Sequence, residues 1–397
     1  MSNTQKKNVP ELRFPGFEGE WEEKQFADFT KINQGLQIAI NERKTEYSPE
    51  LYFYITNEFL RPNSQTKYFI EKPPQSVIAN KEDILMTRTG NTGKVVTNVF
   101  GAFHNNFFKI KFDKNLYDRL FLVEVLNSSK IQNKILSLAG SSTIPDLNHS
   151  DFYSISSSYP LLREQQKIGK FFSKLDRQIE LEEQKLELLK QQKKGYMQKI
   201  FSQELRFKDE NGNDYPDWEE KKMGAITTMF SGGTPQSTNT RYYKGDIPFI
   251  RSGEISKTYT ELKINEEALN NSSAKLVEVG DLLYALYGAT SGEVAISKIN
   301  GAINQAVLCI RTNESVEFLL NYLFFSKNKI LNTFIQGGQG NLSANIIKNL
   351  IIETPTIIEQ RKIADFFGII DNLIEIQERK LEFLKQRKQS LLQKMFV

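Results

Sequence analysis

The chain is poor in the residues that build disulfide frameworks and metal sites. Its 397 residues include one cysteine, Cys309, and two histidines, His104 and His149. A single cysteine excludes an internal disulfide and suits a reducing compartment. These three residues also give none of the spacings typical of zinc sites. No apolar run is long enough for a signal peptide or a membrane span. The sequence therefore predicts a cytoplasmic protein that binds no metal.

Catalytic motifs are scarce as well. The segment Gly90–Val95 (GNTGKV) is too short for a P-loop and lacks the hydroxyl residue after the lysine. The only Pro-Pro pair, Pro73-Pro74, lacks both flanks of the Asn/Asp-Pro-Pro-aromatic motif of adenine methyltransferases. Asp217 and Glu219–Lys221 have the residue types of a metal nuclease but crowd them into one short segment. These absences argue against a self-sufficient nuclease or methyltransferase.

The chain also lacks a large excess of positive charge. The formal net charge is only +4, and it divides into +1, +4, −3 and +2 over residues 1–162, 163–201, 202–355 and 356–397. The basic excess thus lies in the second and fourth segments. It could face DNA phosphates, or it could form a charged rim that meets acidic partner subunits. We favour the rim, because charges beside a coiled-coil seam usually set pairing.

What the sequence does contain is an internal duplication. When Pro160 is aligned with Pro355, about half of the positions are identical as far as Phe201 and Phe396. ELRF and WEEK also occur twice, and so do diverged pairs such as DILMTRTGNTGKV with DLLYALYGATSGEV and GAFHNNFFKIKF with GAINQAVLCIRT. These pairs read as short strands with Gly-rich turns. The prediction is an α+β protein with two variable α/β domains at 1–158 and 204–353, and helical regions at 159–203 and 354–397.

Both helical regions carry a heptad pattern of apolar residues, with spacings that alternate between four and three. Polar residues interrupt it at equivalent places, Glu182 with Gln377 and Lys193 with Lys388. Thr356 and Glu359 form a capping-box pattern at the start of the second helix. The residues expected to pair the helices are Phe172, Ile179, Leu186, Leu189, Ile200, Phe367, Ile374, Leu381, Leu384 and Met395.

Two matching stripes in one chain are most simply explained by an intramolecular coiled coil. The alternative is two unrelated surface helices, each of which covers its own domain. Antiparallel pairing would relate the direct repeats by a pseudo-two-fold axis, as in the backbone of duplex DNA. The helix from Asp176 to Phe201 would be about 39 Å long, close to one turn of DNA at roughly 34–36 Å. Such a rod would fix the distance between two half-sites.

The duplicated motifs resemble the specificity subunit of type I restriction–modification systems over essentially the whole chain. The matching residues are E-Q-x-K-I at Glu164 and Glu359, the aspartates Asp176 and Asp371, and K-L-E-x-L-K-Q at Lys185 and Lys380. The resemblance implies a non-catalytic subunit in which each variable domain reads one half of a split, asymmetric DNA site. It implies helices that hold the spacing and dock two methyltransferase subunits.

The same resemblance assigns the chemistry to partner proteins. Methyltransferase subunits would use S-adenosylmethionine to methylate adenine, and restriction subunits would use ATP and Mg²⁺ to cleave DNA; this chain would bind no cofactor. The competing interpretation is a coiled-coil adaptor whose end domains bind protein.

Sequence reading by a protein requires side chains that reach base edges from loops on a rigid body. Arginine suits guanine and Asn or Gln suits adenine, although ordinary hydrophilic turns have the same composition. Lys109 and Lys111 would contact phosphate or lie on an exposed strand face. The candidate DNA-binding residues are Arg61, Arg88, Asn91, Lys94, Lys109, Lys111, Ser231, Thr234, Arg241, Tyr242, Tyr243, Arg251, Gln336, Gln339 and Asn341.

Overall fold

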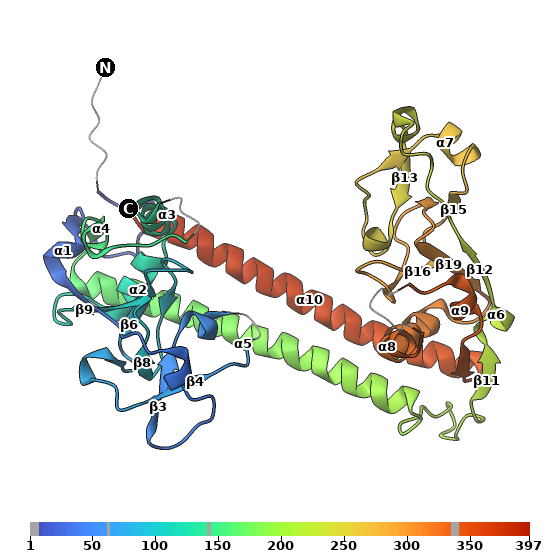
Figure 1. Cartoon of the computed structure of the whole chain (residues 1–397), viewed down its shortest axis with the longest axis horizontal. Helices are drawn as coiled ribbons and strands as arrows, with labels where there is room; N and C mark the ends of the chain where they lie inside the picture. The colour runs from blue at the N-terminus through green and yellow to red at the C-terminus, as the bar shows by residue number, and fades with distance from the viewer. Residues whose placement is uncertain (1–7, 62–63, 141–143, 335–340) are drawn as a thin grey trace. The chain divides into compact units, whose positions relative to one another are not determined.

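The computed structural model describes residues 8–61, 64–140, 144–334 and 341–397. The fold is α+β, and two compact units share the chain (Figure 1). Unit 1 consists of residues 1–184 and 379–397, and unit 2 consists of residues 185–378. Each unit therefore contains one α/β domain together with a segment of each long helix, which divides the chain differently from the linear boundaries expected from the sequence.

Unit 1 is built on two four-stranded sheets. In the first, strand order is β2-β9-β6-β7 and all neighbours are antiparallel; in the second it is β4-β3-β8-β5, with β3 and β8 parallel. The pair β1 and β10 forms a separate ribbon. The strands are β1 (Glu22–Gln25), β2 (Thr30–Gln34), β3 (Leu51–Ile55), β4 (Tyr68–Glu71), β5 (Ile78–Ala79), β6 (Ile84–Thr87), β7 (Val95–Val96), β8 (Gly101–Phe103), β9 (Phe107–Phe112) and β10 (Ser156–Tyr159).

Unit 2 repeats this topology strand for strand. Its sheets have the orders β12-β19-β16-β17 and β14-β13-β18-β15, with β13 and β18 parallel, and β11 pairs with β20. The duplication thus includes the segments whose sequences have diverged. The strands are β11 (Glu219–Lys222), β12 (Thr227–Ser231), β13 (Ile247–Ile250), β14 (Lys263–Ile264), β15 (Lys275–Val277), β16 (Leu282–Ala285), β17 (Val294–Ile296), β18 (Gly301–Ile303), β19 (Val307–Thr312) and β20 (Ile351–Thr354).

Short helices cover the first sheet of each unit. Unit 1 uses two helices, broken at Ser128, where unit 2 uses the single helix α8. The α-helices are α1 (Phe26–Phe29), α2 (Arg119–Asn127), α3 (Ser129–Ala139), α4 (His149–Tyr153), α6 (Met223–Ile226), α7 (Glu266–Asn270), α8 (Val316–Phe334) and α9 (Ala344–Lys348). The 3-10 helices are η1 (Ile40–Glu42), η2 (Asn57–Leu60), η3 (Gln75–Val77), η4 (Thr240–Tyr243) and η5 (Ser252–Glu254).

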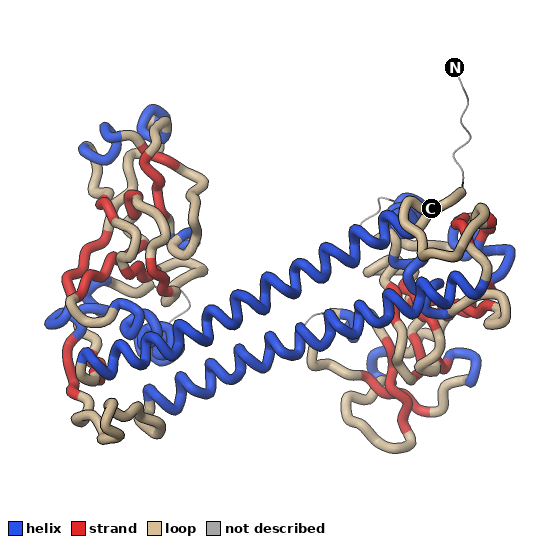
Figure 2. Tube along the Cα trace, turned by 180° about the vertical axis from the view of Figure 1, so that it is seen from behind, coloured by secondary structure: helices blue, strands red, loops and turns tan. Residues whose placement is uncertain are grey.

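The long helices are α5 (Leu162–Phe201) and α10 (Ile357–Met395), drawn as uninterrupted helices in Figure 2. The Thr356 hydroxyl accepts a hydrogen bond from the Glu359 amide at 3.4 Å, so the expected N-cap is present. The Glu359 carboxylate, however, accepts from Arg206 at 2.8 Å. The partner of the Glu359 side chain is thus Arg206, whereas in a capping box it would be the backbone N–H of Thr356.

Within each unit the two helices pair antiparallel, as expected. In unit 1, Asp176 forms an ion pair with Lys388 at 2.7 Å and Glu182 forms one with Lys380 at 2.5 Å. Residue numbers along α10 therefore decrease in the direction in which those along α5 increase. In unit 2, Lys190 meets Glu378 at 2.7 Å and Lys193 meets Asp371 at 2.6 Å, again in opposite order. Three of the four polar heptad positions, Glu182, Lys193 and Lys388, thus take part in ion pairs between the helices.

The apolar heptad residues join the cores of both units. Phe172 and Met395 belong to the main core of unit 1, and Ile200 and Phe367 belong to that of unit 2. Leu381 and Leu384 are buried, and the remaining expected pairing residues, Ile179, Leu186, Leu189 and Ile374, are half-buried. Burial of these side chains away from water favours pairing of the helices.

The repeated motifs contact each other in the same way in both units. The arginine of ELRF binds the glutamate of E-Q-x-K-I: Arg13 meets Glu164 at 2.7 Å in unit 1, and Arg206 meets Glu359 at 2.8 Å in unit 2. The Leu12 amide donates to the Lys394 carbonyl at 2.8 Å, and the Leu205 amide donates to the Lys199 carbonyl at 2.9 Å. Contacts between the duplicated ELRF and E-Q-x-K-I motifs therefore attach each domain to its helices.

Candidate nucleic-acid interface

At one end of unit 1, loops from distant parts of the chain are joined by backbone hydrogen bonds. The His104 amide donates to the Ile55 carbonyl at 2.9 Å, the Arg88 amide to the Asn106 carbonyl at 2.7 Å, and the Leu147 amide to the Arg88 carbonyl at 2.9 Å. These bonds bring together the turns after β3, β6 and β8 and the segment before α4. We call this the loop end of unit 1.

Unit 2 has the same loop end. The Asn304 amide donates to the Ile250 carbonyl at 3.3 Å, the Leu286 amide to the Ala306 carbonyl at 2.8 Å, and the Leu342 amide to the Leu286 carbonyl at 2.7 Å. Each bond is the counterpart of one in unit 1. The two units therefore present loops from a common scaffold.

The β6–β7 turn of unit 1 exposes only some of its candidates. Asn91 and Lys94 are exposed. Arg88 instead binds Asp146 through two hydrogen bonds of 3.1 and 2.6 Å and lies over the Phe108 ring. Partial burial opposes ionisation of Asp146, but its hydrogen bonds from Thr89 and Arg88 outweigh this and lower its pKa. A base edge would have to compete with Asp146 for Arg88.

Three further candidates of unit 1 differ in their exposure, and the expectation for Lys109 is wrong. Lys109 is buried, and its ammonium group donates to the Ile78 carbonyl at 2.6 Å. Burial lowers its pKa, since the charged form is poorly solvated. Lys109 therefore lies neither at a phosphate-binding surface nor on an exposed strand face. Lys111 is exposed, and Arg61 is an exposed residue paired with Glu58 at 2.7 Å.

In unit 2 the candidates form two groups. Ser231 ends β12, and Thr234 follows it and hydrogen-bonds to Gln305. Arg241, Tyr242 and Tyr243 lie on η4, where Arg241 is exposed and the tyrosines are half-buried.

Arg251 and Asn341 complete the described candidates of unit 2. Arg251 binds Glu254 at 3.0 Å and Glu261 at 2.5 Å, and hydrogen bonds to these carboxylates raise its pKa. Asn341 is exposed beside Leu342, which contacts the β16–β17 turn. Gln336 and Gln339 lie outside the described residues.

Three polar residues of the loop ends were not expected from the sequence. Gln37 hydrogen-bonds to Asn105 at 3.1 Å, and Gln305 binds Thr234. Asn105 and Gln305 occupy equivalent turns in the repeated segments GAFHNN and GAINQ. The repeat itself was the signal that could have found them.

The side chains of the two loop ends are chemically unlike. The β6–β7 turn of unit 1 carries Arg88 and Lys94. The equivalent β16–β17 turn of unit 2 carries Leu286 and Glu293, and Glu293 binds Lys327 at 2.5 Å. Leu286 is buried, so the scaffold carries two basic side chains at this turn in unit 1 and an acidic side chain at the same turn in unit 2. The two loop ends therefore differ in the hydrogen-bond donors and acceptors that they carry.

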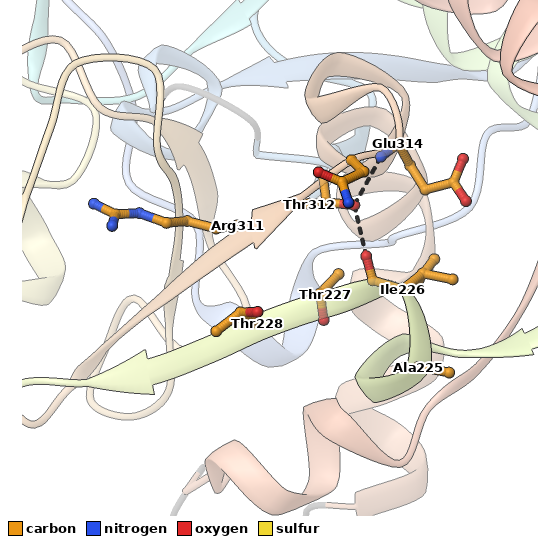
Figure 3. A pocket seen from close by; sticks show the side chains of 8 residues that line it. Ala225, Ile226, Thr227, Thr228, Arg311, Thr312 and Glu314 are labelled. Carbon is orange, nitrogen blue, oxygen red and sulfur yellow. Dashed lines mark hydrogen bonds between the residues drawn. The ribbon is translucent and has the colours of Figure 1, made fainter.

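Unit 2 also has a hollow of about 460 Å³ at the opposite ends of β12 and β19. Figure 3 shows Thr312 between Ile226 and Glu314, with Arg311 extending away from them. Arg311 binds Asp281 at 2.8 and 2.7 Å, and the Glu314 carboxylate accepts from Gln360 at 2.8 Å. Both charged side chains in the hollow are thus engaged by protein partners.

Within the residues that the structure describes, no group of three or more His, Cys, Asp or Glu side chains is placed to hold a metal ion. In the same part of the chain, no helix has the length and apolar content needed to cross a bilayer.

Comparison with known proteins gives a consistent result. The model of the type I restriction modification DNA specificity domain matches residues 18–191 and 215–386. The MjaVIII specificity subunit of Methanocaldococcus jannaschii is 25% identical over 97% of this chain and 93% of its own length. The putative MjaX specificity subunit of the same organism is 26% identical over 72% and 69%.

Among solved structures, the S subunit of a type I restriction–modification system from M. genitalium has a similar fold. Its TM-score is 0.63 at 17% sequence identity, and the alignment covers 98% of this chain and 99% of that one.

Proposed function

Because the chain belongs to the type I restriction–modification DNA specificity family, we propose that it reads a bipartite, asymmetric DNA sequence for a multisubunit methyltransferase and nuclease. Each unit takes one half of the site, and α5 and α10 hold the spacing. The chain has no catalysis of its own. Partner subunits methylate adenine with S-adenosylmethionine, or cleave DNA with ATP and Mg²⁺.

The observation that carries this proposal is the pair of loop ends. The same backbone hydrogen bonds recur in both units, while the side chains at the tips differ. Sequence-specific reading needs a fixed support and variable donors and acceptors. A scaffold duplicated for reasons of stability alone has no need for unlike exposed turns.

Docking of two methyltransferase subunits is supported by a second apolar stripe on the helices. Ile369, Leu373 and Ile376 on α10 and Leu188 on α5 are 63%, 48%, 51% and 54% exposed within unit 2. Their heptad positions place all four on one flank of an antiparallel pair. An exposed apolar strip of this kind fits a further helix from a partner.

The weak net charge has a consequence for the isolated chain. Phosphate neutralisation by Lys and Arg supplies most non-specific affinity for DNA. With a formal net charge of only +4, the chain depends on its partners for tight binding.

An exchange of one variable domain tests the proposal. Residues 1–155 are replaced by the variable domain of another family member, and the complex is produced in cells with its partner subunits. Methylome sequencing should then show a new first half-site, with the second half and the spacing unchanged. An adaptor that binds only protein would show no DNA preference before or after the exchange, and that result would refute the proposal.

A further inference from the structure

In each unit, two chain segments cross so closely at the loop end that only glycine fits. A side-chain carbon on Gly35 would lie 2.1 Å from the Phe103 carbonyl oxygen, and one on Gly232 would lie 1.8 Å from that of Ile303. Both distances are far below van der Waals contact. The segment after β2 or β12 is therefore pressed against the turn that joins β8 to β9 or β18 to β19.

Two residues beyond each crossing, a side chain of one segment hydrogen-bonds to a side chain of the other segment. Gln37 lies two residues after Gly35, and its Oε1 accepts from Asn105 Nδ2 at 3.1 Å. Thr234 lies two residues after Gly232, and its hydroxyl donates to Gln305 Oε1. Asn105 and Gln305 are each two residues after the carbonyl at their crossing. The two pairs are thus equivalent in position and different in chemistry.

The turn that carries Asn105 or Gln305 is fixed independently of the pair. His104 Nδ1 accepts from the Asn106 amide at 3.1 Å, and Asn304 Oδ1 accepts from the Ala306 amide at 3.1 Å. In unit 1 the Asn105 amide also donates to the Leu36 carbonyl at 3.0 Å. The backbone therefore does not need the side-chain pair to hold its shape.

Both pairs are open to a ligand. Gln37, Thr234 and Gln305 are exposed, and Asn105 is half-buried. Asn105 Oδ1 is buried and has no hydrogen-bond partner among protein atoms. A ligand donor that reaches this oxygen after a small movement of the neighbouring side chains would satisfy it. All four side chains are uncharged, which suits the recognition of hydrogen-bond patterns rather than attraction to phosphates.

We propose that Gln37 with Asn105, and Thr234 with Gln305, are the specificity-determining pairs that read base edges in the first and second half-sites. The inference rests on the proposed function and adds the residues that select the bases. An amide presents one donor and one acceptor side by side, which matches the N6 and N7 edge of adenine. A hydroxyl beside an amide can rotate its proton and serve as donor or acceptor, so the second pair reads a different pattern.

Reciprocal transplantation tests the proposal. One variant carries Gln37→Thr with Asn105→Gln, and the other carries Thr234→Gln with Gln305→Asn, each in the full complex in cells. Methylome sequencing should show a preference changed or relaxed about ten- to hundredfold at one or more positions. The first variant should change only the first half-site and the second variant only the second, so each serves as the control for the other.

Gln37→Ala guards against a failure to fold, because it only shortens an exposed side chain. If a variant abolishes methylation, the purified complex is used to select from duplexes randomised in one half-site. An altered selected half-site supports the proposal, and the wild-type half-site overturns it. Unchanged motifs, or a change in the wrong half or in the spacing, also overturn it. A wild-type complex with no bipartite motif would instead refute the proposed function.

Discussion

Glu124 is a carboxylate with little exposure to water, on α2 of unit 1. It is 3% exposed and lies 3.1 Å from the ammonium group of Lys388, which also binds Asp176 at 2.7 Å. Burial raises the pKa of Glu124 to about 7, although Lys388 acts in the opposite direction. In unit 2 the equivalent helix position holds Asn321, which carries no charge.

This carboxylate should make the stability of unit 1 depend on pH. The folded protein holds a proton on Glu124 up to a pH of about 7, whereas the unfolded chain releases it near the ordinary value of 4.5. The free energy of unfolding should therefore fall as pH rises from about 4.5 to about 7. We expect Glu124→Gln to lose part of this dependence, as measured by thermal unfolding at pH 5 and pH 8.

The control is Glu82→Gln, which removes an exposed carboxylate paired with Lys114. That variant should keep the wild-type difference between the two pH values. Equal pH dependence in the wild type and in Glu124→Gln would contradict the assignment.

For the candidate DNA-binding residues, the sequence showed which side chains can donate or accept hydrogen bonds, but not which of them are exposed and free to do so. It selected Arg88, Arg251 and Lys109 as ligands for DNA, yet the first two are engaged by carboxylates and the third is buried. Their partners come from segments that only the tertiary fold brings close, or from a turn whose shape was unknown. The Gln37–Asn105 pair was missed for the same reason, since the two residues are 68 positions apart.

Among elements, the long helices were the most predictable. A heptad period is a local property, so the pattern at Phe172, Leu381 and Met395 could be read before any contact was known. The strands of the two diverged domains could be outlined only through their shared turns. The order of those strands, with one parallel pair in each unit, depends on long-range contacts that no periodicity encodes.

The exposed stripe on α10 gives a prediction about assembly. Leu373→Asp places a charge in the middle of the stripe and should weaken docking of a methyltransferase subunit by about tenfold or more, because an apolar contact becomes a buried, unpaired carboxylate. Asn372→Asp, on the neighbouring outward face, introduces the same charge outside the stripe. Co-purification of the subunits measures the difference. If both variants assemble like the wild type, the stripe is not a docking surface.

For the whole molecule, the continuity of α5 and α10 through both units predicts how the target can be lengthened. One added heptad extends a helix by about 10 Å, which corresponds to about three base pairs. Seven residues inserted after Gln184 and after Glu378 preserve the seam. The spacer in the methylated motif should grow by about three base pairs while both half-sites stay the same, as read by methylome sequencing.

The same insertion in α5 alone is the control. It leaves about two helical turns of apolar residues without partners on α10 and should lower the thermal stability of the chain. A double insertion that assembles and methylates with the original spacer would show that the helices do not set the spacing.

The contact between Leu12 and Lys394 repeats the one between Leu205 and Lys199. In unit 2 the two partners belong to one continuous stretch of chain. In unit 1 the same contact joins two segments that are not consecutive in the chain. The segments around Leu12 and Lys394 in unit 1 are thus held together as the consecutive segments around Lys199 and Leu205 are in unit 2. A circularly permuted chain, cut between Lys199 and Leu205 and joined by a linker between Lys394 and Leu12, should keep the contacts within each unit. Its two α/β domains would then follow one another in the reverse order.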